Sequence, residues 1–351
     1  FIWVPIVDLS LSLNKWYLIA VSLCSISLLS IILVPLDVQN KAILMVVVFI
    51  SQVAGAFSSA PLGGFMAKLV KDSQKGRASG MYQAGNLGGI GIGGGLGLWI
   101  TEHYSYLTAL LLIVGLCSLC TCTLFFLPKI SAIKGDVKRR FKIIVLDLKG
   151  LFSNKISIYT TILMTTPIAV GAVASMWSSI ADQWNVLPDT TALITGVLSA
   201  ILSVLGCIVG GFICDKFSRW TGFFGSGITL GLIAIIMAFT TFNNLNFCIG
   251  VLVYAFILGI GYASFSAVII HAIGKENAST KYTFLSSLGN VPLVYLLALN
   301  GYIADNYNIK YMLVAEALLG IGFAIIFLGI LWKMGFPTKT VKLDTLSQLE
   351  N

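Results

Sequence analysis

Few residues within the apolar part of the sequence could carry chemistry, and Glu316 is the clearest of them. It lies about two helical turns inside the apolar run 310–332. Ionisable residues at such depth are costly and mark functional sites, so Glu316 is a candidate for exchanging a proton with the outside. The alternative is a neutral or hydrogen-bonded Glu near the lipid headgroups.

Charge also gathers in the segment 211–219, where one apolar run ends and the next begins. Asp215 falls at the C-terminal end of the first helix, where the helix dipole makes a carboxylate unfavourable. Another group is therefore expected to hold Asp215, either the N-terminus of a neighbouring helix or the pair Lys216 and Arg219. His271, at the inner end of another run, is interpreted as an interfacial residue.

The sequence contains no set of residues with the spacing of a metal site or of a nucleophile and its base. Cys117, Cys120 and Cys122 lie in the middle of an apolar run without histidines beside them. They are predicted to pack as small hydrophobic residues. We therefore expect no metal, no cofactor and no catalytic residue.

The composition of the chain indicates a membrane protein. Of its 351 residues, 57% are hydrophobic and 10% are charged, and the mean hydropathy is +0.94. Soluble domains carry roughly 25% charged residues, so this chain could not cover a surface facing water. Its apolar residues come in long runs and not in short alternating strands, which predicts an all-α polytopic fold and excludes a barrel.

Ten apolar runs are long enough to cross a bilayer as helices. They cover 16–36, 41–67, 80–100, 105–127, 156–181, 191–214, 221–242, 246–270, 282–303 and 310–332. Residues 1–9 read as the last turns of an earlier span, and the first residue is not Met. We therefore interpret the sequence as lacking an N-terminal helix or more.

The basic residues predict the orientation. Twenty of the 22 Lys and Arg residues lie in alternate loops and the tail, and the opposite loops hold Lys41 and Lys310. Basic loops stay in the cytoplasm, so both termini of the complete protein are predicted to be cytoplasmic, in a cell (inner) membrane. The net charge of +8 then reflects topology and contact with anionic membrane lipid, and nucleic-acid binding is excluded.

The longest and most basic loop divides the chain into parts. We predict an incomplete N-terminal helical bundle at 1–128, a cytoplasmic linker at 129–155, a C-terminal six-helix bundle at 156–333 and a cytoplasmic tail at 334–351. The linker is either a solvated connection or, in part, a helix lying along the inner membrane surface. The second interpretation rests on an apolar helical face formed by Val137, Phe141, Ile144, Val145, Leu148 and Phe152.

An internal repeat relates the two sides of the linker at an offset of 204 residues. Lys15-Trp16 recurs as Arg219-Trp220, Arg77 as Lys281, and Gly85-Asn86 as Gly289-Asn290. Asp8 and Asp215 are also counterparts, with a further shift of three residues. Repeated halves of this kind are typical of secondary transporters built from parallel repeats.

The segment Gly211-Phe212-Ile213-Cys214-Asp215-Lys216-Phe217-Ser218-Arg219 resembles the loop signature of the major facilitator superfamily, with Ser218 in place of its second Gly. The resemblance implies two bundles of six helices and secondary transport by alternating access. In that family such charged residues latch the two bundles in one state. The implied latch residues are Asp8, Arg77, Asp215, Lys216, Arg219 and Lys281. The alternatives for Arg77 and Lys281 are a contact with lipid phosphate and a role in orientation alone.

The counterpart segment near the N-terminus carries a second resemblance. Its pattern Trp3-x-Pro5-x-x-Asp8, followed by Lys15-Trp16, is similar to the muropeptide permease and acetyl-coenzyme A transporter branch of the superfamily. Val4 stands in place of the first Gly of the loop signature. The segment 58–66 lacks the acidic residues that this branch carries there.

Glycine is concentrated in one predicted span, where eight of the thirteen residues at 85–97 are Gly. Part of this run resembles the antiporter signature of the superfamily, with Ile90 in the position of its Pro. Small residues at every fourth position let two helices approach closely. Close helix packing is therefore predicted at Gly85, Gly89, Gly93 and Gly94. A nucleotide-binding loop is excluded, because the glycines lie inside a span and no strand precedes them.

Polar residues near the middle of the spans are candidates for the substrate path. The resemblance implies that the first, fourth, seventh and tenth helices line the cavity. The candidates at mid-depth are Gln52, Thr165, Thr166, Tyr254 and Tyr262. Trp177 lies nearer the outside, whereas Gln83, Asn86 and Asn290 lie nearer the inside. Each could instead form a hydrogen bond between helices.

These features predict a secondary active transporter that moves a small organic solute by alternating access. Proton coupling, through Glu316, stays open, as does the choice between symport and antiport. The path residues are polar, aromatic and uncharged, so we expect a neutral, zwitterionic or amphiphilic solute and a monomeric protein. The alternatives are a membrane-embedded enzyme, a lipid-handling protein or a channel, but the sequence lacks a reactive cluster and lacks rings of charge along a pore.

Overall fold

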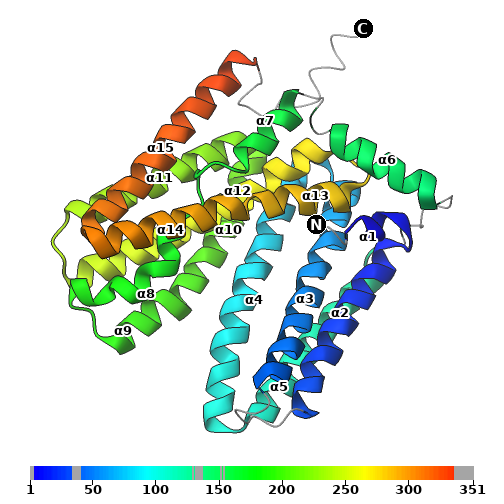
Figure 1. Cartoon of the computed structure of the whole chain (residues 1–351), viewed down its shortest axis with the longest axis horizontal. Helices are drawn as coiled ribbons and strands as arrows, with labels where there is room; N and C mark the ends of the chain where they lie inside the picture. The colour runs from blue at the N-terminus through cyan, green and yellow to red at the C-terminus, as the bar shows by residue number, and fades with distance from the viewer. Residues whose placement is uncertain are drawn as a thin grey trace. The chain divides into compact units, whose positions relative to one another are not determined.

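The computed structural model describes residues 4–33, 41–128, 130, 137–150, 152 and 155–335, which form helices joined by short turns (Figure 1). Eight helices among these residues are long and apolar enough to cross a membrane. The predicted all-α membrane fold is confirmed. Two of the ten predicted spans are not among these eight. The span 80–100 lies in α4 (Lys75–His103), which is long enough but whose many glycines lower its hydropathy, and the span 156–181 is interrupted.

The helices form two compact units that do not coincide with the two halves of the sequence. Unit 1 contains Phe1–Leu69, Ile92–Ile158 and Ile273–Leu285, and unit 2 contains Val70–Gly91, Tyr159–Ala272 and Ser286–Asn351. Each unit therefore includes a short segment from the other half of the sequence. The domain boundaries predicted above stay predictions, and the predicted tail lies outside the described residues from residue 336 onwards.

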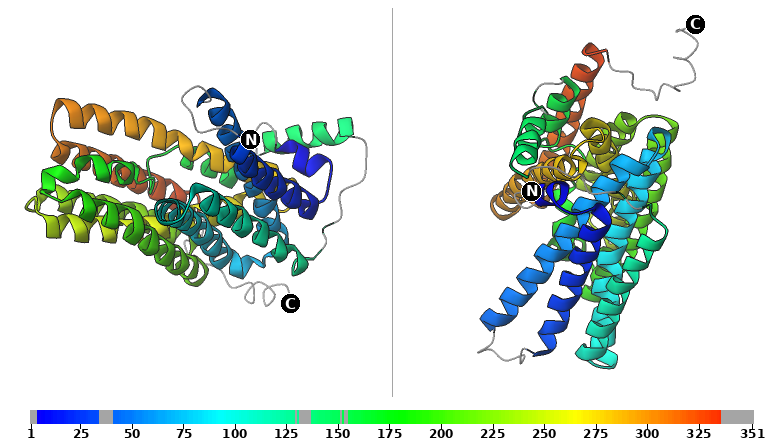
Figure 2. Two further views of the ribbon diagram at one scale, coloured as in Figure 1. Left: turned by 90° about the horizontal axis from the view of Figure 1, so that it is seen from below. Right: turned by 90° about the vertical axis from the view of Figure 1, so that its right-hand side faces the viewer.

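Unit 1 is built around α2 and α3, which lie side by side (Figure 2). Its helices are α1 (Pro5–Leu9), α2 (Leu13–Ser30), η1 (Ile31–Leu33), α3 (Lys41–Leu69), α5 (Tyr106–Leu119), η4 (Cys120–Phe125) and α6 (Val137–Gly150). The Ser12 hydroxyl accepts a hydrogen bond from the backbone N–H of Lys15 and so caps α2. Val7, Tyr17 and Phe65 belong to the apolar core that joins α1, α2 and α3.

Unit 2 has its own apolar core, in which α11 and α15 lie side by side (Figure 1). Its helices are η3 (Asp72–Gln74), α9 (Pro188–Ala192), the π-helical turn η7 (Leu193–Leu198), α10 (Ser199–Lys216), α11 (Arg219–Phe239), α12 (Asn244–Ile273), α14 (Asn290–Asn306) and α15 (Ile309–Lys333). The first turns of α4 and the last residues of α13 (Ala278–Leu288) also belong to it.

The predicted span 156–181 is not one continuous helix. The chain forms α7 (Lys155–Leu163), leaves helical geometry, and resumes as η5 (Ala172–Met176), α8 (Trp177–Ile180) and η6 (Ala181–Trp184). Pro167 lacks a backbone N–H and keeps the preceding residue out of helical geometry. Ala169 and Gly171 have φ of 56° and 65°. The continuous apolar run therefore gave a wrong prediction at this point, and the non-helical stretch 164–171 is called the interrupted segment below.

Candidate functional site

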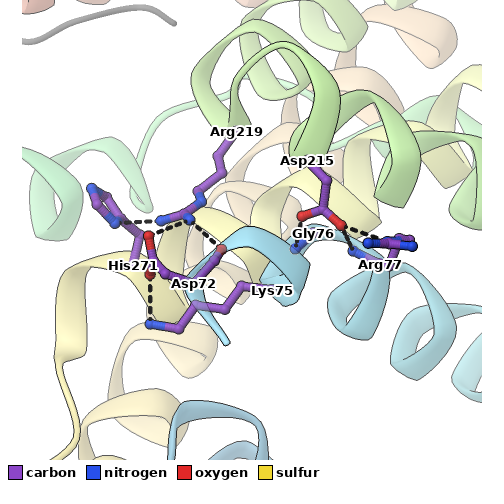
Figure 3. A network of polar contacts seen from close by, with 7 residues as sticks. All are labelled: Asp72, Lys75, Gly76, Arg77, Asp215, Arg219 and His271. Atoms are coloured by element: carbon purple, nitrogen blue, oxygen red, sulfur yellow. Dashed lines mark hydrogen bonds and ion pairs between the residues drawn. The ribbon is translucent and has the colours of Figure 1, made fainter. Parts of the chain in front are cut away.

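Asp215, near the C-terminal end of α10, lies against the N-terminus of α4 in unit 2 (Figure 3). Its Oδ1 accepts a hydrogen bond from the backbone N–H of Gly76 at 2.7 Å. Its Oδ2 accepts from the backbone N–H of Arg77 at 3.1 Å and from Nε of the same residue at 3.0 Å. The first N–H groups of a helix lack partners within it, and this end of the helix dipole favours negative charge. The first of the two predicted alternatives is therefore the one observed.

Glycines allow α4 and α10 to approach closely enough for these contacts. A Cβ at Gly76 would lie 2.7 Å from the carbonyl oxygen of Gly211. A Cβ at Gly80 would lie 2.5 Å from the carbonyl oxygen of Cys207. Backbone atoms cannot move aside as a flexible side chain can, so these two positions of α4 require glycine.

The four glycines predicted to pack are not in such contacts. No heavy atom of the described residues, beyond their own chain neighbours, lies within 4 Å of a Cβ built at Gly85, Gly89, Gly93 or Gly94. On α4 the face packed against α10 is formed by Gly76, Gly80, Gly88 and Gly91. The helical repeat places Gly85, Gly89 and Gly93 on a different side of the helix from this face.

Arg219 forms a second polar cluster in unit 2, separate from Asp215 (Figure 3). Its guanidinium donates to the Asp72 carboxylate at 3.0 Å and to the Asp72 carbonyl oxygen at 2.9 Å, and it also contacts Nδ1 of His271. Lys75 lies 3.1 Å from the Asp72 carboxylate. The second predicted alternative is therefore wrong in this structure, because Arg219 binds Asp72, and Lys216 lies over the Phe217 ring at 5.5 Å.

The electrostatics of this cluster favour an ionised Asp72. Partial burial raises the pKa of the Asp72 carboxyl, but the charge and hydrogen bond of Arg219, together with Lys75, outweigh it and lower the pKa from 3.8 to about 2. Asp72 therefore stays charged at any pH above about 4. The cluster joins η3, the start of α11 and the end of α12 through one anion and two cations.

Asp8 makes the corresponding contact in unit 1. Its Oδ2 accepts from the backbone N–H of Thr280 at 2.9 Å and from the Thr280 hydroxyl at 2.8 Å, in the first turn of α13. Thr280 is the residue 204 positions after Gly76, so the two donor positions keep the offset of the sequence repeat, whereas the two carboxylates keep the further shift of three residues. Lys281, the counterpart of Arg77, lies 3.9 Å from Asp147 of α6 and donates to the Ile273 carbonyl oxygen at 3.3 Å.

Glu316 is buried in unit 2, where three elements supply hydrogen bonds to its carboxylate. The backbone N–H of Val173 in η5 donates at 3.0 and 3.3 Å to its two oxygens, and the Tyr254 hydroxyl donates at 3.4 Å. Nδ2 of Asn300 also donates to it. None of the ion pairs among the described residues includes Glu316. Donors of hydrogen bonds thus surround the carboxylate, and no cation from the part of the chain that the structure describes pairs with it.

Three of the predicted path residues line one pocket of unit 2, a hollow of about 80 Å³ that is partly open to solvent. They are Thr166, Tyr262 and Asn290. The interrupted segment supplies one wall, including Ile168 and Ala169, and Phe223, Phe265 and Pro292 supply apolar surface. The polar lining is uncharged: beside the three path residues it comprises Ser286 and backbone groups.

The other predicted path residues lie elsewhere. Tyr254 and Trp177 are buried together, with ring centroids 5.5 Å apart, beside Glu316. Gln83 donates to the Ser266 hydroxyl at 2.6 Å and accepts from Asn86 at 3.3 Å. The Thr165 carbonyl oxygen accepts from the Tyr295 hydroxyl at 3.2 Å. Gln52, in unit 1, is exposed on α3.

Sequence reasoning missed Asp72, His271 and Asn300 as members of these clusters. The spacing of Asp72 and Lys75, three residues apart at a helix start, was an available signal for an ion pair. Nothing in the sequence alone pairs Asn300 with Glu316. No group of three or more His, Cys, Asp or Glu among the described residues could hold a metal ion.

Comparisons with known proteins agree with this architecture. The family model of the Major Facilitator Superfamily matches residues 1–294. No curated protein sequence matches the chain. Among solved structures, the proton:xylose symporter XylE bound to 6-bromo-6-deoxy-D-glucose superposes with a TM-score of 0.65 and 15% identity, covering 96% of this chain and 83% of that one.

The fucose:proton symporter FucP of E. coli gives a higher structural similarity. A variant of it superposes with a TM-score of 0.73 and 14% identity, covering 92% of this chain and 85% of that one. A second FucP structure, in the outward conformation, gives a TM-score of 0.72 and 15% identity, covering 93% and 86%. At these identities the likeness concerns the fold alone.

Proposed function

Because the chain belongs to the major facilitator superfamily and is therefore a secondary active transporter, we propose that it carries a small neutral, zwitterionic or amphiphilic organic solute by alternating access. The observation that supports this solute class is the composition of the unit 2 pocket. Its polar groups are uncharged, and its remaining surface is aromatic and aliphatic. A strongly anionic solute would require Lys or Arg there.

Within this pocket, Tyr262, Asn290 and Thr166 are the proposed contacts to the solute. A tyrosine hydroxyl, an amide and a threonine hydroxyl can each donate and accept, so they suit hydroxyl, amide or carbonyl groups. Phe223 and Phe265 offer apolar contact on the same walls. Gln52, Gln83 and Asn86 stay path residues of the proposal, and Tyr254 and Trp177 are proposed to act beside Glu316.

Asp215 with Arg77 and Asp8 with Thr280 are the proposed latches on the cytoplasmic side. Both carboxylates hold the N-terminus of a helix from the opposite half of the sequence. Transport by alternating access requires that these contacts break in one state and form again in the other. Arg219, through Asp72, and Lys281 are proposed to support the latches, whereas Lys216 contacts the Phe217 ring and not a latch carboxylate.

Protons are the proposed coupling ion, with Glu316 as the proton site. Its burial without a cationic partner supports this assignment. XylE and FucP are named as proton symporters, which favours symport over the antiport that the glycine pattern suggests. The muropeptide permease and acetyl-coenzyme A transporter branch remains a proposal based on the first residues of the sequence.

The proposed setting is a monomer in a cell (inner) membrane, with both termini of the complete protein in the cytoplasm and with no enzymatic activity. The basic loops face anionic lipid on that side. The exposed apolar residues Phe141, Val145 and Phe152 on and just after α6 suit a helix at the inner membrane surface.

Uptake into proteoliposomes tests the proposal. The complete protein is reconstituted and offered a panel of radiolabelled neutral sugars, zwitterionic peptides and amphiphilic solutes, with and without an inward proton gradient. Saturable accumulation of a member of the panel, increased by the gradient, is expected. Accumulation of none of them by folded protein would contradict the proposed solute class. Glu316→Gln is the matched variant for coupling, and pH-driven uptake that equals the wild type would remove Glu316 as the proton site.

A further inference from the structure

The carboxylate of Glu316 joins α15 to the beginning of the outer part of the interrupted span. It accepts from the backbone N–H of Val173, and Ala172 contributes a second backbone contact, both at the start of η5. These N–H groups lie immediately after the interrupted segment, where no preceding helix can supply acceptors for them. Glu316 thus accepts the backbone hydrogen bonds that a preceding turn of helix would otherwise accept.

Polar groups from three elements, α12, α14 and η5, face Glu316. Tyr254 comes from α12, with Tyr262 beside it on the same helix, and Asn300 comes from α14. Backbone N–H groups come from η5. Tyr254, Asn300 and the backbone N–H of Val173 donate to the carboxylate, an arrangement that suits the ionised form.

The Asn300 amide has an acceptor oxygen that makes no hydrogen bond in this structure. Its side chain is fully buried, its Nδ2 donates to Glu316, and its Oδ1 has no hydrogen-bond partner. An unpaired buried carbonyl oxygen is costly. When a proton binds Glu316, an O–H bond forms on one carboxyl oxygen, and rotation of the Asn300 amide by half a turn presents Oδ1 as the acceptor for it. The site can therefore hold both protonation states.

The same stretch of backbone forms a wall of two hollows. Ile168, Ala169 and Val170 line the pocket proposed for the solute. On its other side the interrupted segment lines a smaller hollow of about 20 Å³, which is room for one water molecule and which Glu316 and Tyr254 also line. Ala317 and Gly320 of α15 and Gly227 and Gly231 of α11 give this second hollow small walls. The segment therefore borders a hollow on each side, a larger one at the solute pocket and a smaller one at Glu316.

We propose that Glu316 is a proton-operated clamp on the interrupted segment, whose ionised form holds η5 and the pocket wall in place and whose protonated form releases them. A neutral carboxylic acid accepts backbone hydrogen bonds about half as strongly as a carboxylate, so protonation weakens the hold on Ala172 and Val173. The segment then shifts towards the smaller hollow and changes the shape of the solute pocket. This inference rests on the proposed function, because it describes how the proton site would act on the solute site.

Hydrogen–deuterium exchange on the full chain in detergent tests the clamp. In the wild type, exchange of the peptide that covers 164–176, corrected for the intrinsic pH dependence of exchange, is expected to accelerate as the pH falls. In Glu316→Gln, an uncharged side chain of the same shape, exchange is expected to be roughly tenfold faster and independent of pH. Glu276→Gln, in the turn between α12 and α13, is the matched control and is expected to behave as the wild type.

Tyr254→Phe provides a variant that keeps the carboxylate if Glu316→Gln does not fold. It removes one donor to the ionised form, so release of the segment is expected to begin at a higher pH than in the wild type. Corrected exchange of 164–176 that does not change with pH in the wild type, or that is the same in wild type and Glu316→Gln, would overturn the clamp. Failure of uptake with an intact exchange transition would instead count against the proposed function and leave the clamp standing.

Discussion

The Asp215 carboxylate accepts a hydrogen bond from the backbone N–H of Gly76 at 2.7 Å across 139 positions of sequence, and this contact is the centre of the latch proposed above. It is a helix cap supplied by another helix. Arg77 adds an ion pair at 3.0 Å, but its side chain is half exposed, so water screens part of that attraction. Asp8 repeats the capping contact on Thr280.

Removing the charge of Asp215 should weaken the contact between α10 and α4. In Asp215→Asn one acceptor oxygen and the favourable interaction with the helix dipole are lost, at a cost of about 2 kcal/mol. We expect a lower thermal midpoint of the protein in detergent and faster labelling of a cysteine introduced at Ser79, which is fully buried.

Lys216→Gln is the control for that experiment. Lys216 stands next to Asp215 in the sequence, but it contacts the Phe217 ring and does not pair with the carboxylate. Its substitution should leave the midpoint and the labelling rate unchanged. Equal effects of the two variants would mean that general loss of charge, and not the helix cap, stabilises this contact.

Two glycines of α4 should respond in opposite ways to the same substitution. The added Cβ of Gly80→Ala would lie 2.5 Å from a backbone carbonyl oxygen of α10, so the helices must separate, at about 1–3 kcal/mol. The Cβ of Gly85→Ala meets nothing within 4 Å among the described residues, and alanine favours helix by up to about 1 kcal/mol. Thermal unfolding of the two variants checks this order, and a larger loss for Gly85→Ala would contradict the packing face assigned to α4.

The Asp72 cluster should resist mild acid. Since the pKa of Asp72 in the folded protein is about 2, below its ordinary 3.8, its contribution to stability is present above about pH 4 and is lost as the pH falls towards about 2. The difference in thermal midpoint between wild type and Asp72→Asn should therefore be constant from neutral pH down to about pH 4 and then decline. It should be small, because half of the Asp72 side chain is exposed. A difference that already disappears near neutral pH would contradict this electrostatic description.

The sequence could predict those features of the site that depend only on neighbouring positions, such as the end of a helix or a repeated pattern. The position of Asp215 at a helix C-terminus required an external partner, and the sequence repeat located its counterpart Asp8 in the other half, at an offset three residues longer than 204. The interruption at Pro167 and Gly171 was missed because hydrophobicity measures depth in the membrane and not backbone geometry. Asn300 could not be assigned, because its contact with Glu316 depends on how α14 and α15 pack. The glycine periodicity of α4 likewise identified the helix and not the face that packs.

Substitutions in the unit 2 pocket should separate solute binding from the transport cycle. Asn290→Leu and Tyr262→Leu each remove a polar group from the lining. If these side chains bind the solute, the KM of uptake should rise by roughly tenfold with little change in the maximal rate, because about one hydrogen bond to the solute is lost. Tyr302→Leu, an exposed tyrosine on α14 outside the pocket lining, is the control and should leave the KM unchanged. A fall in the maximal rate at constant KM would show instead that the two residues act in the conformational change, as hydrogen bonds between helices would.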